Sequence, residues 1–255
     1  MSKYKIGITE AGDAGLDLSW VNKLDMVDGA IVITKNVSLD FCDAVMANKD
    51  KLIVHTTFTG YGHSILELNV PPLCEDLDAV MSLVKNGFPK EKIVIRVDPI
   101  IPTPKGIDTA SRVIKTFIDV GFSRFRVSII DMYPHVRVRF ANIGLPLPYG
   151  DRGFSPNAEQ VHAVNKMLGD VAAYGSSVIS NETLMIESCA EPGLTNAIQR
   201  GCISSYDLHL LGLNDEISPD SYGFQRKNCL CYSGKTELLA CKKQCVNKCL
   251  YCYWR

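Results

Sequence analysis

Three cysteines near the C-terminal end of the sequence have the spacing of a metal-binding loop. Cys245, Cys249 and Cys252 are separated by three and then by two residues. Thiolates are soft ligands for zinc and for iron–sulfur clusters, and short spacings let one loop wrap closely around such a centre. Three thiolates leave one position of a four-iron cluster open, and an open metal position can take a small-molecule ligand. The spacing predicts a metal site that also binds a ligand.

Four further cysteines form a second candidate set of ligands. Four thiolates would saturate a second cluster, whereas the alternatives are a four-thiolate zinc site or buried free thiols. Cys241 leaves another alternative open, because a fourth thiolate beside the C-terminal three would give a closed zinc site. The members of the second set are Cys189, Cys202, Cys229 and Cys231.

The C-terminal three cysteines, with Tyr251 just before the last of them, resemble the signature of radical S-adenosylmethionine (SAM) enzymes. In that superfamily the amino and carboxylate groups of SAM occupy the open iron of a 4Fe-4S cluster. The resemblance implies an oxygen-sensitive enzyme that needs SAM and a low-potential electron donor such as flavodoxin or ferredoxin. The cysteines normally follow the first strand in that superfamily, whereas here they follow all the predicted strands.

Longer stretches resemble the family called domain of unknown function eighteen forty-eight, whose members carry a Cys-x3-Cys-x-Tyr-Cys-Tyr tail. The match spans nearly the whole chain. The stretches that carry it are Gly29–Asn36, Thr57–Gly62, Asn69–Pro72, Val94–Ile101, Cys189–Glu191 and Gln225–Cys231.

The same loop is similar to the Cys-Met-Tyr-Cys-Tyr loop of spore photoproduct lyases, which repair a thymine lesion in DNA. This similarity implies a thymine-derived base in DNA as a substrate, with a free nucleotide, a peptide or another small molecule as alternatives. From Tyr222 onward the chain has seven basic residues and one acidic residue, within a net charge of −1. Such a tail can attract phosphates, or it can offset the negative charge of thiolate-bound clusters.

Short β-branched runs alternate with stretches of helical period, a pattern typical of βα units around a parallel sheet. Parallel strands with crossover helices gather their chemistry on the loops after the strands. We expect a partial (β/α)6 TIM-like barrel over residues 1–212, and a cysteine-rich, cluster-binding extension over residues 213–255 that packs on the barrel mouth. The expected strands are Lys5–Thr9, Ala30–Thr34, Leu52–Thr57, Ile93–Val97, Phe125–Ile130 and Leu184–Ser188.

Local signals place the expected helices and the remaining candidate site residues. A helix is expected to begin at Ser155 as N-cap with Pro156 in its first turn, and a short one is expected near Thr236–Cys241. Thr9 and Glu10 end the first strand and are candidates for further SAM contacts. Arg96 and Asp98 end the fourth strand, where they can hold the ribose or carboxylate of SAM or form a structural ion pair.

Composition narrows the class of protein. The chain has 255 residues, and its 46% hydrophobic content is ample for a large buried core. The first ten residues contain no apolar run of signal-peptide length and no later run is long enough to span a membrane, so we expect a cytoplasmic protein without a membrane partner. The cytosol keeps thiols reduced, which favours metal ligation over disulfides for the ten cysteines.

Two functions follow from these features. The first is a radical SAM enzyme with one SAM-binding cluster and a second, auxiliary cluster. The second is a non-enzymatic barrel that binds zinc or an iron–sulfur cluster and transfers electrons, with Cys241 completing a closed site.

Overall fold

The computed structural model describes residues 3–180, 183–213, 228–239 and 245–253. Within these ranges, eight strands form one sheet in the order β7-β6-β5-β4-β3-β2-β1-β8, and every pairing is parallel. Neighbouring strands from β1 to β7 are consecutive in the chain, with β7 and β8 at the edges. The strands are β1 Ile6–Ile8, β2 Gly29–Thr34, β3 Leu52–Thr57, β4 Ile93–Ile100, β5 Arg124–Ile129, β6 Met185–Ser188, β7 Ile198–Gln199 and β8 Lys235–Glu237.

All six strands expected from β-branched runs are present, whereas β7 and β8 were not expected. The helix expected near Thr236–Cys241 is wrong where the structure describes it, because β8 occupies Lys235–Glu237. The backbone there bonds to β1, with Leu238 N–H donating to the Ile8 carbonyl at 2.8 Å. Part of the predicted 213–255 extension therefore belongs to the same sheet as the first strand. Cys241 lies outside the described residues.

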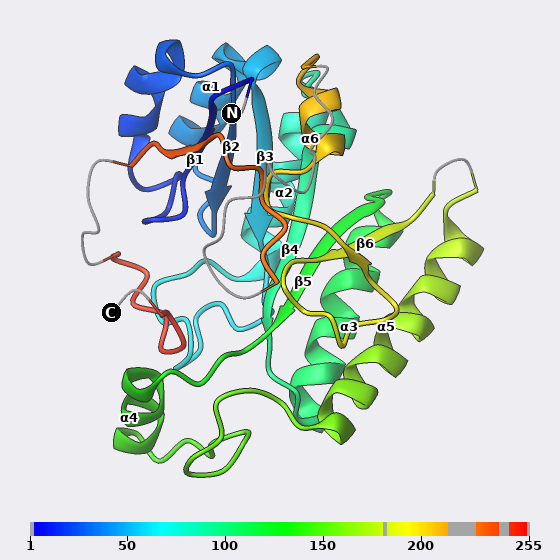
Figure 1. Ribbon diagram of the computed structural model, residues 1–255. Helices are drawn as coiled ribbons and strands as arrows, with labels where there is room; N and C mark the ends of the chain where they lie inside the picture. Colours follow the sequence, from blue (N-terminus) through cyan, green and yellow to red (C-terminus); the bar gives the residue numbers. More distant parts are fainter. Residues whose placement is uncertain (1–2, 181–182, 214–227, 240–244, 254–255) are drawn as a thin grey trace.

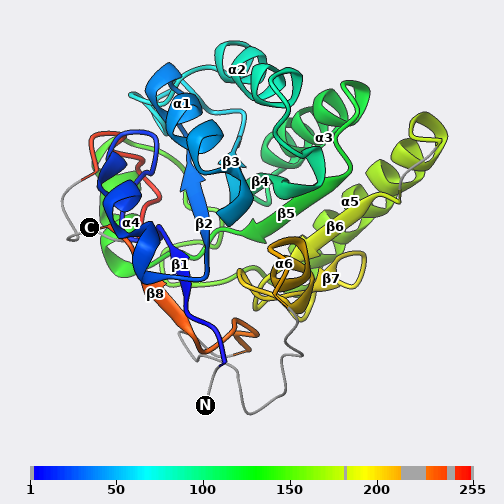
Figure 2. The same cartoon turned by 90° about the horizontal axis from the view of Figure 1, so that it is seen from above.

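Helices α1, α2, α3 and α5 cover one face of the sheet, and α6 lies on the other face (Figure 1). In the view from above, α1, α2 and α3 follow one another along the outside of the curved strands (Figure 2). The α-helices are α1 Leu39–Ala47, α2 Leu73–Lys85, α3 Pro104–Asp119, α4 Pro134–Asn142, α5 Ala158–Val178 and α6 Ser205–Leu210, and the 3-10 helices are η1 Leu18–Met26, η2 Lys49–Lys51 and η3 Lys90–Lys92.

Helix α5 begins later than its sequence indicates. The expected N-cap at Ser155 is wrong, because Asn157 is the N-cap of a capping box with Gln160. The Gln160 N–H donates to the Asn157 side chain at 2.9 Å, and the Asn157 N–H donates to the Gln160 side chain at 3.0 Å. This reciprocal pair satisfies the backbone N–H groups of Asn157 and Gln160 at the start of the helix.

The two faces of the sheet have different chemistry because side chains alternate along a strand. Residues such as Val54, Ile95 and Phe125 face the helices and belong to the larger apolar core. On the opposite face, Ile53 and Val94 pack in a second cluster that also contains four cysteines. Further along β3, β4 and β5, this inner face becomes polar, and it forms the floor of the candidate site.

Candidate functional site

A cavity of about 380 Å³ lies at the carboxyl ends of the strands. Its walls come from the segments that follow β1 and β2, the ends of β3, β4 and β5, and the C-terminal loop around Cys249. This is the edge of a parallel sheet at which loops gather functional side chains. The seven predicted metal ligands all line it, although they come from distant parts of the chain: Cys189, Cys202, Cys229, Cys231, Cys245, Cys249 and Cys252.

The second set of cysteines contains a compact group. The sulfur atoms of Cys189, Cys229 and Cys231 all lie within 4.8 Å of one another, and all three residues are buried. Cys202 is next to them, because its backbone N–H donates to the Cys231 sulfur at 3.2 Å. Three segments of the chain meet here: the end of β6, the loop before α6 and the segment before β8, which supplies two of the cysteines. Cys189, Cys229 and Cys231 can bind a metal ion or an iron–sulfur cluster. We call all four residues the Cys189 group.

The C-terminal cysteines are arranged more openly. Cys249 is buried, and Cys245 and Cys252 are half-buried. Among the described residues, they do not form a group with all sulfurs within 4.8 Å, whereas Cys189, Cys229 and Cys231 do. We call the segment 245–253, which carries these cysteines, the C-terminal loop.

Hydrogen bonds to its backbone anchor the C-terminal loop against the rest of the molecule. The Leu250 N–H donates to the Leu66 carbonyl at 3.0 Å, and the Asn69 side chain donates to the Val246 carbonyl at 2.6 Å. From α4, Arg139 donates to the Cys249 carbonyl at 3.3 Å and also to that of Cys252. The loop therefore has fixed partners on both sides of its cysteines.

Asp13 ties the C-terminal loop to the ends of β1 and β2. Its buried carboxylate accepts hydrogen bonds from the Lys35 backbone at 2.8 Å, the Asn36 side chain at 2.9 Å and the Asn247 side chain at 2.8 Å. The Asn36 and Asn247 side chains also bond to each other at 3.0 Å. One carboxylate thus joins three segments that are far apart in sequence.

We expect Asp13→Ala to weaken this junction strongly. Loss of the carboxylate leaves several buried donors without an acceptor, which should lower the free energy of unfolding by on the order of 3 kcal/mol. The loop should also become accessible, so limited proteolysis should cut the C-terminal segment at least several times faster. Asp78→Ala, at an exposed position of α2, is the matched control. Equal cleavage rates in the two variants would show that Asp13 does not anchor the loop.

Lys35, Glu67 and Tyr251 form a second junction directly beneath the loop. The Lys35 ammonium lies 2.8 Å from the Glu67 carboxylate and 5.5 Å from the centre of the Tyr251 ring. Tyr251 donates its hydroxyl to Glu67, and Thr59 does so at 2.6 Å. Tyr251, identified above by its resemblance to cluster loops, is therefore a buried contact between the loop and the wall of the cavity.

Of the four other residues predicted to contact SAM, three line the cavity and one does not. Glu10, Arg96 and Asp98 line the cavity, and Arg96 and Asp98 form an ion pair in which Asp98 also accepts from Ser128. Thr9 is fully buried and does not line the cavity. Its hydroxyl accepts the Ile33 N–H at 2.8 Å, so it joins β1 to β2.

The inner face also carries an ion network that the sequence analysis missed. Glu187 of β6 is fully buried and accepts from Arg124 at 3.3 Å and from Arg126 at 2.6 Å. It also pairs with Arg200, while Arg124 reaches Asp207 of α6 at 2.6 Å. A sequence signal existed, because charged residues at alternate positions of an apolar strand must share one face.

The thiols of Cys202 and Cys249 have opposite electrostatic surroundings, whereas contacts with the neighbouring thiols raise the pKa values of Cys189 and Cys231. Hydrogen bonds from the thiols of Cys189 and Cys231 hold the pKa of Cys202 well below its ordinary value, and Arg96 and Arg126 add to this shift. Burial raises the pKa of the Cys249 thiol to about 12, and Glu67 adds to the increase, whereas Lys35 opposes it. Negative charge is therefore favoured beside Cys202 and disfavoured at Cys249.

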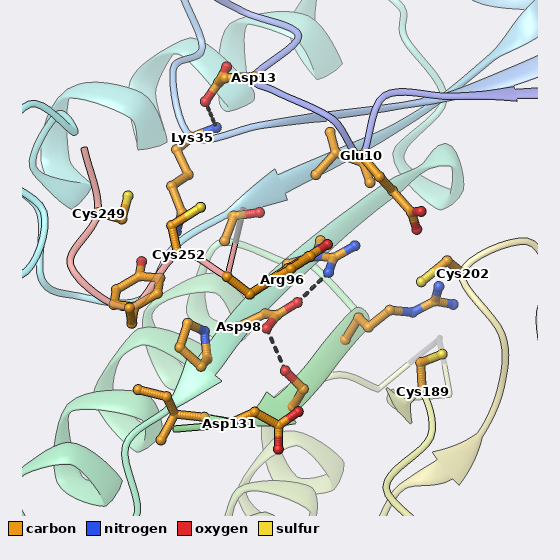
Figure 3. Close-up of a pocket in the computed structure, with 18 of the residues that line it drawn as sticks. Glu10, Asp13, Lys35, Arg96, Asp98, Asp131, Cys189, Cys202, Cys249 and Cys252 are labelled. Atoms are coloured by element: carbon orange, nitrogen blue, oxygen red, sulfur yellow. Dashed lines mark hydrogen bonds and ion pairs between the residues drawn. The ribbon is translucent and has the colours of Figure 1, made fainter. Parts of the chain in front are cut away.

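The close-up of the cavity shows the two groups at its two ends (Figure 3). Cys249 and Cys252 lie on one side, Cys189 and Cys202 lie on the other, and Arg96 and Asp98 stand between them. The charged side chains of Arg96 and Asp98 therefore lie in the middle of the cavity, where a ligand between the two cysteine groups would contact them.

Fold and site together define a parallel α/β protein with a cysteine-lined cavity that can hold metal. The model of the domain of unknown function DUF1848 matches residues 19–254, so the chain belongs to this family. No curated protein and no solved structure matched the chain significantly. None of the helices described is both long and apolar enough to cross a membrane.

Proposed function

We propose that this chain is a radical SAM enzyme that binds a 4Fe-4S cluster at Cys245, Cys249 and Cys252. One observation carries the proposal: two cysteine groups, seven residues in all, line the same cavity at the carboxyl edge of a parallel sheet. Buried thiols that bind no metal act as small apolar side chains, which have no reason to gather around one cavity. Metal binding explains this many thiols around one cavity better.

The residues present fit such a cluster. The C-terminal loop offers three soft donors, its backbone is anchored on both sides, and none of the described cysteines is in a disulfide. Three donors leave one iron for the amino and carboxylate groups of SAM, as the resemblance of the loop implies. When bound, the reduced cluster supplies the electron that cleaves SAM to a 5'-deoxyadenosyl radical, which abstracts hydrogen from the substrate.

The chain's own residues position the ligand and keep water out. We assign the ribose or carboxylate of SAM to Arg96 and Asp98, with Glu10 as a further contact, because these charged residues line one side of the cavity. A reactive species must be held close to one C–H bond and shielded from solvent. We further propose that the curved sheet is a partial (β/α)6 barrel, with the 213–255 extension over its mouth.

For the substrate, we propose a thymine-derived base in DNA, on the similarity of the loop to that of spore photoproduct lyases. The cavity accommodates small ligands, so a base in a duplex would have to leave its stack to react. If an oligonucleotide that contains thymine lesions does not stimulate SAM cleavage, this substrate is excluded. The electron would come from a low-potential donor such as flavodoxin or ferredoxin.

The decisive experiment is anaerobic reconstitution followed by metal analysis and reduction in the presence of SAM. We expect about eight iron atoms per chain, shared by the C-terminal loop and the Cys189 group, and formation of 5'-deoxyadenosine. Zinc without iron or sulfide, or iron without 5'-deoxyadenosine, would refute the enzymatic proposal.

A second function is favoured by the compactness of Cys189, Cys229 and Cys231. Sulfur atoms within 4.8 Å of one another suit one tetrahedral ion, since zinc–sulfur bonds of about 2.3 Å place ligand sulfurs about 4 Å apart. In this alternative the chain is a zinc-binding or electron-transfer protein without SAM chemistry. The same metal analysis separates the two, because the alternative predicts one or two zinc ions per chain.

A further inference from the structure

The ion network on the inner face of the sheet contains more guanidinium groups than carboxylates; Arg200 of this network is partly exposed, and Glu10, which also lines the cavity, pairs with Lys235. Among the described residues, four guanidinium groups pair with only three carboxylates. The arginines are Arg96, Arg124, Arg126 and Arg200, and the carboxylates belong to Asp98, Glu187 and Asp207.

His55 does not change this balance. It is fully buried among these arginines, and burial together with Arg126 and Arg96 lowers its pKa well below the ordinary value. The imidazole is therefore neutral, and a positive charge remains on the inner face.

Arg96 and Arg126 are the two arginines of this network that line the cavity. They are direct partners in the register of β4 and β5, so their side chains project from the same face of neighbouring strands. Like charges placed opposite each other destabilise a sheet. In addition, the Nε and Nη1 atoms of both side chains have no hydrogen-bond partner among the described residues. Such buried donors are costly unless an acceptor or a negative charge lies nearby.

The nearest candidate for that negative charge is the Cys189 group. Both guanidinium groups interact electrostatically with Cys202, and the same cavity wall contains Cys189, Cys229 and Cys231. Arg96 points toward the side of the cavity where Cys202 and Cys189 lie (Figure 3). A metal centre held by three or four thiolates carries a net negative charge, and a positive pair beside it offsets that charge in a low-dielectric setting.

The cations beside the C-terminal loop differ in the part of the chain that the structure describes: Arg139 is half-buried and donates to the Cys249 and Cys252 carbonyls, and Lys248 is exposed. The buried ammonium of Lys35 is neutralised by Glu67 at 2.8 Å. Glu67 is almost fully buried and also bonds to Tyr251 of the loop, so a carboxylate lies close to the cysteines there. An added electron is therefore less well stabilised at the C-terminal loop than beside Arg96 and Arg126.

From this contrast we propose that the Cys189 group holds a redox-active iron–sulfur centre whose reduction potential Arg96 and Arg126 raise above that of the C-terminal loop centre. The inference rests on the proposed function, which supplies iron to both groups. Reduction takes one electron from the external low-potential donor, without a bond being made or broken. The first electron that enters the protein then resides at the Cys189 group, which makes this centre an electron store beside the SAM site.

The test is an anaerobic redox titration of the iron-loaded full chain, followed by electron paramagnetic resonance. Two midpoint potentials are expected, and Cys229→Ser with Cys231→Ser should abolish the higher one. Arg126→Gln and Arg96→Gln should each lower the midpoint potential of that centre by at least about 59 mV, which is a tenfold change in the equilibrium constant for one-electron reduction. The lower of the two midpoint potentials should not change. Arg126→Lys, which keeps the positive charge, should retain a midpoint potential close to that of the wild type.

Controls separate this inference from the proposal on which it rests. Arg112→Gln removes an arginine that is 68% exposed on α3, and it should move neither potential. Glu187 retains Arg124 and Arg200 when Arg126 is changed, and the Arg96 variant provides an independent measurement if the Arg126 variants do not fold. Unchanged potentials in Arg126→Gln and Arg96→Gln, at wild-type iron content, overturn the inference. Failure of the proposed function is seen separately, as missing iron or missing 5'-deoxyadenosine in the wild type.

Discussion

Replacing Cys249 with serine is expected to abolish the formation of 5'-deoxyadenosine, with a loss of at least a thousandfold. A serine hydroxyl is a hard and weakly acidic donor that does not replace a thiolate on iron. Cys249 is the buried central member of the C-terminal three, and Arg139 holds its carbonyl at 3.3 Å. The backbone of the loop should therefore keep its place, and the variant should lose a ligand without losing the fold.

The measurement combines chromatography of 5'-deoxyadenosine with iron analysis after anaerobic reconstitution. Iron should fall to about half of the wild-type content, because the Cys189 group retains all its ligands. Cys74→Ser is the matched control, since Cys74 is exposed on α2 and does not line the cavity. It should keep full iron and full SAM cleavage. Wild-type activity in Cys249→Ser would exclude the C-terminal loop as the SAM site.

The second large effect is expected on stability, from Glu187→Gln. Glu187 is fully buried and pairs with Arg124, Arg126 and Arg200. The variant leaves these guanidinium groups without their shared counter-charge. Breaking a buried ion pair by removal of one partner costs about 3–5 kcal/mol. Urea denaturation of the metal-loaded chain at neutral pH should show a loss of this size.

The pH dependence gives an independent check. The surrounding arginines, Arg126 first, lower the pKa of Glu187 to about 2 against the opposing effect of burial. A carboxylate with a lowered folded-state pKa stabilises the protein above its unfolded pKa of about 4.3, and this contribution is lost as the pH falls toward 2. Wild type should lose stability across this window more steeply than Glu187→Gln.

Asp108→Asn is the control for the Glu187 experiment. Asp108 and Arg112 form an exposed pair on α3, with side chains 67% and 68% accessible. Exposed pairs contribute little, so the change should cost less than about 0.5 kcal/mol and should leave the acid transition unchanged. If Glu187→Gln behaves like this control, the buried network does not stabilise the fold.

Much of the sheet could be predicted because its signals are local. The runs at Leu52–Thr57 and Ile93–Val97 are β-branched and continuous, as expected for strands that are buried on both faces. By contrast, β7 and β8 have two and three residues and no such pattern. The backbone conformation of β7 is decided by pairing with β6, and that of β8 by pairing with β1. β1 and β8 are far apart in the sequence.

The site shows the same division between local and long-range information. The spacing of the C-terminal cysteines and Tyr251 indicates a metal-binding loop from eight consecutive residues. The contacts that hold this loop come from Asp13, Lys35 and Glu67, whose partners lie about two hundred residues away along the chain. No spacing rule links such residues, because only the folded sheet brings the ends of β1 and β2 to the loop.

The sequence by itself determined the parallel α/β pattern, the candidate thiol ligands and the short spacing that makes one loop a candidate cluster site. These properties depend on neighbouring residues and on the chemistry of single side chains. The tertiary structure alone decided that Cys189, Cys202, Cys229 and Cys231 meet, that Thr9 lies outside the cavity and that Arg96 and Arg126 face the second cysteine group. Distance and burial set the strength of electrostatic interactions, and both are defined only once the strands have paired.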